Sequence, residues 1–397
     1  MHSRFGTAER KTAYNPASIM GARFIPVFVL FIAIPRAHGV KPVTIAQMGE
    51  ILDANRGRSD TRVAGEIAGF KLTERVSARQ FAAWEAQFPG PQTQDRLLVL
   101  SDESAFQPLP ASEISADPSP ALSAEEKILD AARIYASKTM RNLPNLLAIR
   151  TTVHFQSSSD DALKRARENP VGSEGVDDLP LSFTGQSSAP IAYRDGNEVA
   201  VDHGRMPGSH GLTTRDEFGP ILTIVLGDAK QGSIVWGYWQ RNGNTRIAVF
   251  RYRVPAEKSH YLVNFPEGGL IRLRPAYHGE IAIDPETGSI LRLSIVSDPK
   301  RLPEPAIGVV VEYGSVNLGD RPYIVPLHGI ALGKVPIGSI PRQDGSAITP
   351  VQTFLNDIAF RSYQLFRADS RILSPEESRQ LREEVPAAGS PGSPQHP

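Results

Sequence analysis

Residues 233–296 constrain the fold of this chain more than any other stretch. Apolar and polar residues alternate there over short segments, and residues suited to turns separate the segments. The separators 241–244 and 284–288 contain the asparagines, glycines and proline that tight reversals need. The stretch therefore predicts consecutive hairpins of one antiparallel sheet. The expected strands are 233–241, 245–254, 259–265, 270–277, 279–284 and 289–296.

The segment 245–254 predicts how this sheet is buried. Phe250 and Tyr252 alternate with Arg251 and Arg253, so one face is apolar and the other is basic. We therefore expect one buried face and one face in solvent. The same reasoning predicts further strands at 145–156, 306–318, 323–332 and 352–366 and a hairpin at 191–202. It predicts a long surface loop over 157–189, which is polar and has no period.

Composition excludes several classes of protein. The 397 residues include 43 basic and 43 acidic side chains, and this balance argues against a nucleic-acid-binding protein. Cysteine is absent, so disulfides, thiolate nucleophiles and cysteine-ligated metals are excluded. We expect no cofactor, no nucleic-acid partner and no membrane span after the first segment.

Residues 1–39 have the pattern of a secretory signal peptide. Basic residues precede the apolar run 24–34, and Pro35, Ala37 and Gly39 follow it as a cleavage region. The pattern predicts a periplasmic or secreted protein. Two alternatives remain open: the segment is kept as a membrane anchor, or translation begins at Met20 rather than Met1.

The rest of the chain divides by composition into four parts. Capping patterns that begin at Thr44 and Ser77 predict a small helical unit over 43–101. A linker rich in proline and serine is expected at 102–122, an antiparallel β-rich domain at 123–375 and a disordered tail at 382–397. Within the β-rich domain, a capping box at Ser123 predicts one helix and residues 214–226 predict another that ends at Gly227. The expected fold class is α+β, with a large curved antiparallel sheet and one or two helices packed on it.

Residues that could perform chemistry gather in one short segment. Asp202, His203, His210, Asp216 and Glu217 could bind a metal ion or act as acid and base. The spacing matches no established ligand pattern, and acidic residues are also favoured at a helix start. The chain contains no nucleophile elbow, P-loop or zinc-protease motif.

Four other histidines lie on predicted strands or at their edges. We expect them to be solvated or at the edge of the core. They are His154, His260, His278 and His328.

Several short segments resemble an uncharacterised family of secreted bacterial proteins. The resemblance covers residues 43–375 and implies a helical unit followed by a β-rich domain, with no activity or site residues to transfer. The order of elements is also similar to the half-barrel of periplasmic lipoprotein carriers, as a fold analogy only. The segments that resemble the family are Tyr135 with Leu143-Pro144-Asn145, Ile149-Arg150-Thr151-Thr152, Glu217-Phe218-Gly219, Tyr277-His278-Gly279 with Asp284 and Thr287-Gly288, and Phe360-Arg361-Ser362-Tyr363 with Phe366.

These observations favour an exported, non-enzymatic protein that binds a lipid or another apolar ligand on the concave face of its sheet. One alternative is a metal-dependent or acid/base hydrolase that uses residues 202–217. Another is a structural scaffold that docks an envelope protein. The residues expected to line the groove are Phe218, Ile221, Leu222, Val225, Trp236, Trp239, Phe250 and Tyr252.

Overall fold

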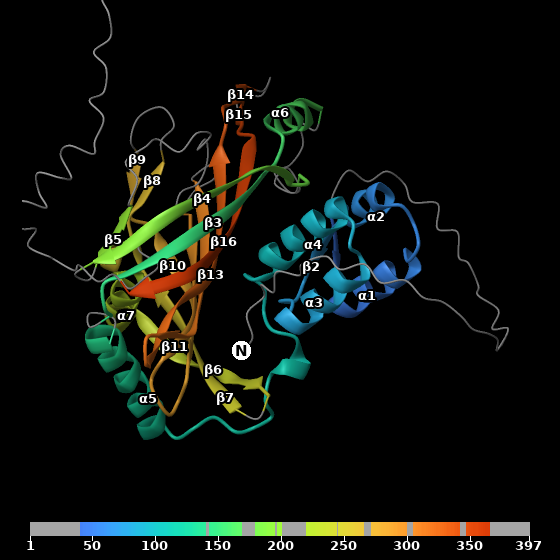
Figure 1. Ribbon diagram of the computed structural model, residues 1–397. Helices are drawn as coiled ribbons and strands as arrows, with labels where there is room; N and C mark the ends of the chain where they lie inside the picture. Colours follow the sequence, from blue (N-terminus) through green and yellow to red (C-terminus); the bar gives the residue numbers. More distant parts are fainter. Residues whose placement is uncertain are drawn as a thin grey trace, which may run out of the picture. The chain divides into compact units, whose positions relative to one another are not determined.

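The computed structural model describes most of the chain between residues 40 and 365 (Figure 1). All described residues belong to one compact unit. The predictions for the signal segment 1–39 and the tail 382–397 lie outside the described residues. The described ranges are 40–139, 143–168, 179–194, 197–200, 220–243, 245–265, 271–299, 305–341 and 347–365.

A ten-stranded antiparallel sheet forms the centre of the fold and confirms the predicted α+β class. Its strand order is β5-β4-β3-β16-β13-β12-β11-β10-β7-β6, and every neighbouring pair is antiparallel. The strands are β3 (Leu146–Gln156), β4 (Ser182–Arg194), β5 (Asn197–Ala200), β6 (Ser233–Asn242), β7 (Thr245–Val254), β10 (Ala276–Ile283), β11 (Ile290–Asp298), β12 (Ala306–Leu318), β13 (Arg321–Pro336) and β16 (Val351–Leu365).

Glycines explain one success and one error of the predicted hairpins. Gly243 and Gly288 have φ angles of 59° and 72°, as the predicted reversals require. Gly279, by contrast, does not separate two strands, because β10 continues through it. A Cβ atom at that position would lie 1.8 Å from the Ser294 carbonyl oxygen, so glycine allows close packing there rather than a turn.

The predicted segments 259–265 and 270–277 contribute little to the main sheet. Among the described residues, β8 (Val263–Phe265) and β9 (Ile271–Leu273) form there and pair with each other in a separate two-stranded sheet, while Ala276 and Tyr277 begin β10 of the main sheet.

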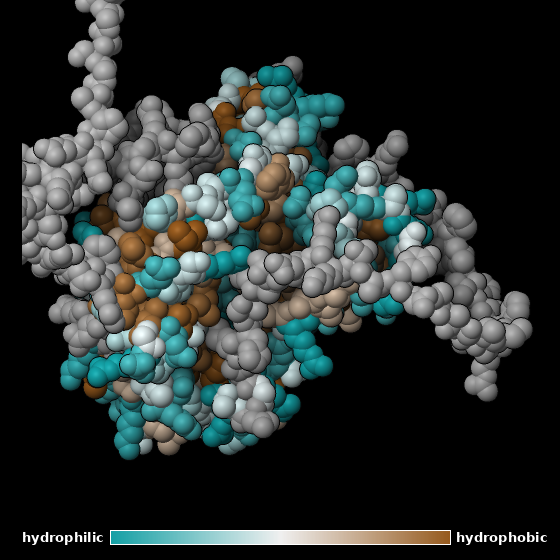
Figure 2. All heavy atoms as spheres, in the orientation of Figure 1, coloured by the Kyte–Doolittle hydropathy of each residue, from teal (hydrophilic) through white to brown (hydrophobic). Residues whose placement is uncertain are grey.

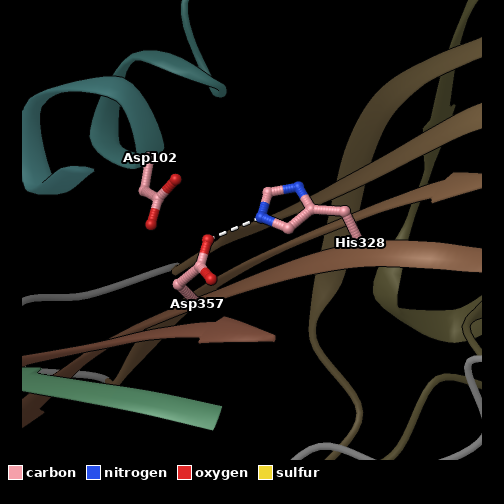
Figure 3. Close-up of side chains that lie close together, drawn as sticks. All are labelled: Asp102, His328 and Asp357. Atoms are coloured by element: carbon pink, nitrogen blue, oxygen red, sulfur yellow. Dashed lines mark hydrogen bonds and ion pairs between the residues drawn. The ribbon is translucent and has the colours of Figure 1, made fainter. Parts of the chain in front are cut away.

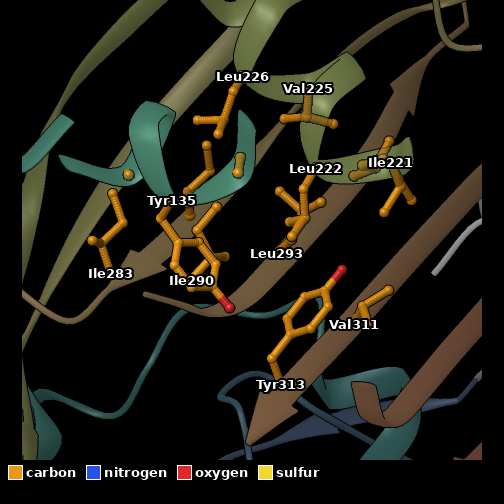
Figure 4. Close-up of a cluster of buried hydrophobic side chains, with 14 of the residues drawn as sticks. Tyr135, Ile221, Leu222, Val225, Leu226, Ile283, Ile290, Leu293, Val311 and Tyr313 are labelled. Atoms are coloured by element: carbon orange, nitrogen blue, oxygen red, sulfur yellow. The ribbon is translucent and has the colours of Figure 1, made fainter. Parts of the chain in front are cut away.

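Three helical segments cover one face of the main sheet. They are α5 (Leu122–Ile134), the π-helix η2 (Tyr135–Thr139) and α7 (Pro220–Gln231). Figure 4 shows Leu222 and Val225 of α7 above Leu293 and Val311 of the sheet, and these side chains belong to the largest hydrophobic cluster. The capping box predicted at Ser123 is wrong, because Ser123 lies within α5 and Ala121 precedes the helix.

Helix α7 continues past Gly227, where the sequence predicted its end. Asp228 explains the extension, because its buried carboxylate holds this last turn in place. The carboxylate accepts hydrogen bonds from the His260 backbone N–H at 2.7 Å and the Tyr277 hydroxyl at 2.8 Å, and its other oxygen lies 2.5 Å from His260 Nδ1. These bonds tie α7 to the neighbouring loop and to β10.

The helical unit covers part of the other face. It consists of β1 (Lys41–Val43), α1 (Ile45–Ala54), α2 (Asp60–Ile67), β2 (Phe70–Leu72), α3 (Ala78–Gln87) and α4 (Pro91–Ser104), around its own hydrophobic cluster. The capping box at Thr44 is confirmed, and the Ser77 hydroxyl accepts a bond from the Gln80 N–H. On α4, Val99 packs with Val310, Ile330 and Leu355 of the sheet.

The expectation of one solvent-exposed sheet face is therefore wrong for the central strands. On β7, Val249 lies on the face opposite Phe250, and it is only 1% exposed to solvent. The segment between α4 and α5, which includes the short helix η1 (Ala111–Glu113), covers this second face, because Leu109 packs with Val249. The same segment reaches the edge strand β6, where the Trp239 indole N–H, on the face of the largest cluster, donates a hydrogen bond to the Pro118 carbonyl at 3.0 Å.

The predicted loop 157–189 contains two regular elements. They are α6 (Ser159–Glu168) and the first half of β4, while residues 169–178 lie outside the described range. Most side chains in this half of β4 are at least partly exposed. Its sequence therefore lacks the alternation of apolar and polar residues that marks a strand with one buried face. Backbone pairing with β3 along its whole length defines the strand instead.

The exposed surface differs between the parts of the molecule. In Figure 2, brown apolar side chains gather around the strands labelled β4, β5 and β10 in Figure 1, whereas hydrophilic side chains predominate on α6. Phe183 on β4 and Val199 on β5 are among the large apolar residues that remain exposed. Among the described residues, none of the helices has the length and apolar character needed to cross a membrane.

The contact between the sheet and Phe106, in the segment just after α4, makes Gly308 sensitive to substitution. A Cβ atom on Gly308 in β12 would lie 2.6 Å from the Phe106 ring. We expect Gly308→Val to displace this ring and lower the free energy of unfolding by about 1–3 kcal/mol, measured by urea denaturation. The control is Gly227→Ala, where an added Cβ meets no atom within 4 Å. It should be neutral or stabilise by up to about 1 kcal/mol, and equal losses in both variants would contradict the prediction.

Candidate functional site

Six charged side chains of alternating sign lie across six adjacent strands of the main sheet. They come from β16, β13, β12, β11, β10 and β7, which are consecutive in the strand order. We refer to this set as the charged row. Its members, in that order, are Asp357, His328, Glu312, Arg292, Glu280 and Arg251.

The strand register places the charged row on one face. Arg292 is opposite Glu312, and Glu312 is opposite His328. Asp357 lies two residues from the direct partner of His328, and Glu280 lies two residues from the direct partner of Arg292. Because alternate residues of a strand share a face, all these side chains project to the same side.

The helical unit covers the charged row. Arg75 Nη1 lies 3.8 Å from Glu280 Oε2, and Arg292 donates a hydrogen bond of 2.5 Å to the Ala105 carbonyl just after α4. Glu280 also accepts a bond from Tyr238, and at the open end Arg251 Nε is 3.4 Å from Glu280 Oε1. The helical unit therefore docks on the sheet through charged groups as well as apolar ones.

At its most buried point, the row's imidazole His328 and carboxylate Asp357 meet a further carboxylate, Asp102 of α4. His328 and Asp357 are each 4% exposed to solvent, and Asp102 of α4 is fully buried. His328 Nε2 lies 2.6 Å from Asp357 Oδ2, and one donor atom from each of the three residues lies within 4.8 Å of the others. Figure 3 shows the carboxylate of Asp102 projecting from α4 toward this pair. On the other side of the ring, Nδ1 is 3.5 Å from Glu312 Oε2.

Neighbouring carboxylates determine the charge of His328. Burial on its own lowers the pKa of the imidazole, but Asp357 and Glu312 outweigh this effect and raise the pKa to about 10. His328 is therefore an imidazolium at neutral pH in the metal-free protein. Its charge compensates the buried Asp357 and the partly buried Glu312, whose carboxylates would otherwise be costly to desolvate.

Arg292 shows that the charged row is not arranged for maximum stability. Burial and the nearby cation Arg75 lower the pKa of its guanidinium to about 9. Two cations thus share this part of the interface, where Glu280 and Glu312 provide the opposite charge. Buried ion pairs of this kind add little net stability, because the cost of desolvating the charges offsets much of their attraction.

A β-bulge lies beside His328. The pairing of β12 with β13 shifts between Glu312, which faces His328, and Tyr313, which faces Pro326, so Leu327 has no direct partner. Bulges bend a strand and redirect its side chains. This one lies at the point where the imidazole enters the charged row.

A cavity of about 170 Å³ lies between the helical unit and the sheet, and we call it the interface cavity. Apolar side chains from both parts form most of its wall. Three basic side chains and one acid, all half-buried, also line it. The apolar residues include Phe70, Val99, Leu100, Phe106, Leu181 and Leu332, and the charged residues are Lys71, Arg96, Lys334 and Glu103.

The structure places most of the predicted groove residues in the hydrophobic core. Ile221, Leu222, Val225, Trp239, Phe250 and Tyr252 are buried in the largest cluster, Trp236 is partly buried against it, and Phe218 lies outside the described residues. Leu222 and Val225 of α7 lie against the sheet, as Figure 4 shows. Ligand binding by this set stays a prediction.

The predicted metal or acid/base cluster also stays a prediction. Asp202, His203, His210, Asp216 and Glu217 all lie outside the described residues.

The histidine predictions hold for three of the four residues. His154 and His278 are half-buried and His260 is exposed, but His328 is a buried member of a charged cluster, so the prediction for it is wrong. Glu312 and His328 are each the only charged residue in an apolar run of a central strand, and Asp357 is the only charged residue in a similar run that also contains Asn356. A lone charged residue in a buried strand was therefore the one feature of the sequence that indicated this site.

Comparisons of the chain with protein-family models, with curated proteins and with solved structures found no match. The resemblance to a secreted bacterial family therefore stays a prediction.

A double-mutant cycle tests the central ion pair of the charged row. We expect His328→Leu and Asp357→Leu each to lower the free energy of unfolding by about 3–5 kcal/mol, because each leaves a buried charge uncompensated. The double variant should lose less than the sum of the two by about 1–3 kcal/mol. The exposed pair Arg133 and Asp130, 2.7 Å apart, is the control and should couple by under about 1 kcal/mol. Additive losses at the buried pair would contradict the assignment.

The raised pKa of His328 predicts a pH dependence of stability. In metal-free buffer its contribution is fully present below about pH 6.5, the pKa of an unfolded histidine. It declines above that value and is lost once the pH has passed the folded-state pKa of about 10. Between about pH 6.5 and 10.5, the stability advantage of the natural protein over His328→Gln should shrink by on the order of a few kcal/mol. Urea denaturation across this range measures it, and a pH-independent advantage would refute it.

Proposed function

We propose that this chain is an exported, non-enzymatic binding protein for a short amphiphilic anion. The ligand is an apolar group of a few carbons that ends in a carboxylate or a phosphate. The interface cavity is the single observation that carries this proposal. Export is supported by the pattern of residues 1–39, in which basic residues precede an apolar run and small residues follow it.

The composition of the interface cavity supports an anionic, partly apolar ligand. Its wall combines aromatic and aliphatic side chains with Lys71, Arg96 and Lys334, against Glu103 as the one acid among the described lining residues. These charged side chains are half-buried, so water screens them less than it screens exposed groups. Burial already lowers the pKa of Arg96, because its charge is partly desolvated. An anion bound beside these basic groups would replace part of the stabilisation that their charges lose when they leave water.

The size of the interface cavity favours a small ligand. Its volume of about 170 Å³ is below the roughly 300–1,000 Å³ of sites for drug-sized molecules. A fatty acid of medium length, or the end of a longer acyl chain, fits this class better than a whole phospholipid. The site lies between the helical unit and the sheet, where lipid binding was not expected from the sequence.

The location of the cavity also gives a route for entry. Its wall comes from both the helical unit and strands β13 and β16, so a shift of the helical unit would change its size.

Octanoate provides a direct test. We expect it to bind the purified full chain in isothermal titration calorimetry more tightly than octanol, which has the same chain and no charge. Lys334→Met should weaken octanoate binding by about 10–100-fold, because an ionic hydrogen bond contributes on the order of 1.5–3 kcal/mol. The same variant should leave octanol binding unchanged.

Lys164→Met is the matched control. Lys164 lies on α6, its side chain is 71% exposed and it does not line the cavity. Its replacement removes the same charge and should leave octanoate affinity unchanged. Equal affinity for octanoate and octanol, or equal effects of the two lysine variants, would reject the proposal.

A further inference from the structure

We propose that Asp102, His328 and Asp357 form a binding site for a divalent transition metal ion, with Zn²⁺ as the ion that this donor set fits best. The proposal is independent of the ligand in the interface cavity. It concerns a different part of the same interface, since none of the three residues lines that cavity.

The donor set is the first argument. One imidazole nitrogen and two carboxylate oxygens lie within 4.8 Å of one another, and all three residues are more than nine-tenths buried. Zinc is commonly bound by histidine nitrogen together with aspartate oxygen. Imidazole also suits copper, iron and nickel, whereas Ca²⁺ and Mg²⁺ prefer oxygen ligands alone.

The orientation of the imidazole is the second argument. His328 directs Nε2 toward Asp357 and places Nδ1 3.5 Å from Glu312. A histidine that binds a metal through one nitrogen usually donates its other N–H to a carboxylate, a backbone carbonyl or a water, which fixes the tautomer and the ring orientation. Glu312 occupies that second position here. A bound ion would take the place of the proton that His328 and Asp357 share.

The origin of the three residues is the third argument. Asp102 belongs to α4, while His328 and Asp357 belong to β13 and β16. A shared ion would therefore tie the helical unit to the sheet at the most buried point of the charged row. Figure 3 shows the three side chains converging from these separate elements.

Zinc titration of the full chain tests the site. The protein is first freed of metal with EDTA, and Zn²⁺ binding is then measured by isothermal titration calorimetry. We expect one high-affinity Zn²⁺ per chain and a rise in the unfolding temperature with Zn²⁺ concentration, because only the folded chain assembles the three ligands. Asp102→Asn and Asp357→Asn should abolish the high-affinity phase.

Two further variants keep the test decisive if a ligand variant fails to fold. Glu312→Gln preserves size and should lower Zn²⁺ affinity by about 10–100-fold, as loss of a carboxylate behind a ligating histidine does. His278→Gln is the control, because His278 forms a comparable pair with Asp298 at 2.8 Å but is 40% exposed. It should leave Zn²⁺ affinity unchanged. Absence of high-affinity binding to the natural protein, or unchanged binding in the Asp357 and Glu312 variants, would overturn the proposal.

Discussion

The contact on which the rest of the structure depends is the buried pairing of His328 with Asp357 beneath α4. Two carboxylates without a cation could not remain ionised in this closed space at acceptable cost. The imidazolium supplies the positive charge, and Glu312 supports it from the other side. The charged row extends this compensation across six strands, with three charges of each sign. The helical unit therefore covers charges of both signs, although Arg251 at the open end of the row stays exposed and Asp102 of α4 adds a further buried carboxylate.

This arrangement gives the two sheet faces different characters. The face under α5 and α7 is held by an apolar core, in which side chains of both helices contact strand residues directly. The face under the helical unit combines a smaller apolar cluster with the charged row and the interface cavity. Apolar packing tolerates small shifts, whereas charged pairs require defined partners. The charged row thus favours one docking position for the helical unit, and the proposed ligand and metal sites both use that position.

The sequence predicted the main elements of this fold for clear physical reasons. The alternation of apolar and polar residues predicted most central strands, and glycines predicted the reversals after β6 and β10. Capping patterns at Thr44 and Ser77 predicted the starts of α1 and α3, where the side chains form local hydrogen bonds. It failed where long-range contacts override local pattern. The polar first half of β4 is a strand only because it pairs with β3, and α7 passes Gly227 only because Asp228 is held by distant partners.

The candidate site was beyond prediction for a related reason. Arg292, Glu312 and His328 become neighbours through strand register, and nothing local in the sequence reports that register. Asp102 was assigned to a linker, yet it lies in α4, which continues to Ser104. A lone charge in an apolar strand indicates that some buried partner exists. It does not show which residue that partner is, so the cluster emerged only from the three-dimensional structure.

Amide hydrogen exchange provides the most direct test that this buried pair docks the helical unit. The natural protein and His328→Gln would be compared residue by residue, under conditions where both remain folded. The account predicts faster exchange in α4 and in the segment after it, with unchanged protection in β7, β10 and α7 on the far part of the sheet. Uniform loss of protection throughout the chain, or unchanged protection in α4, would contradict it.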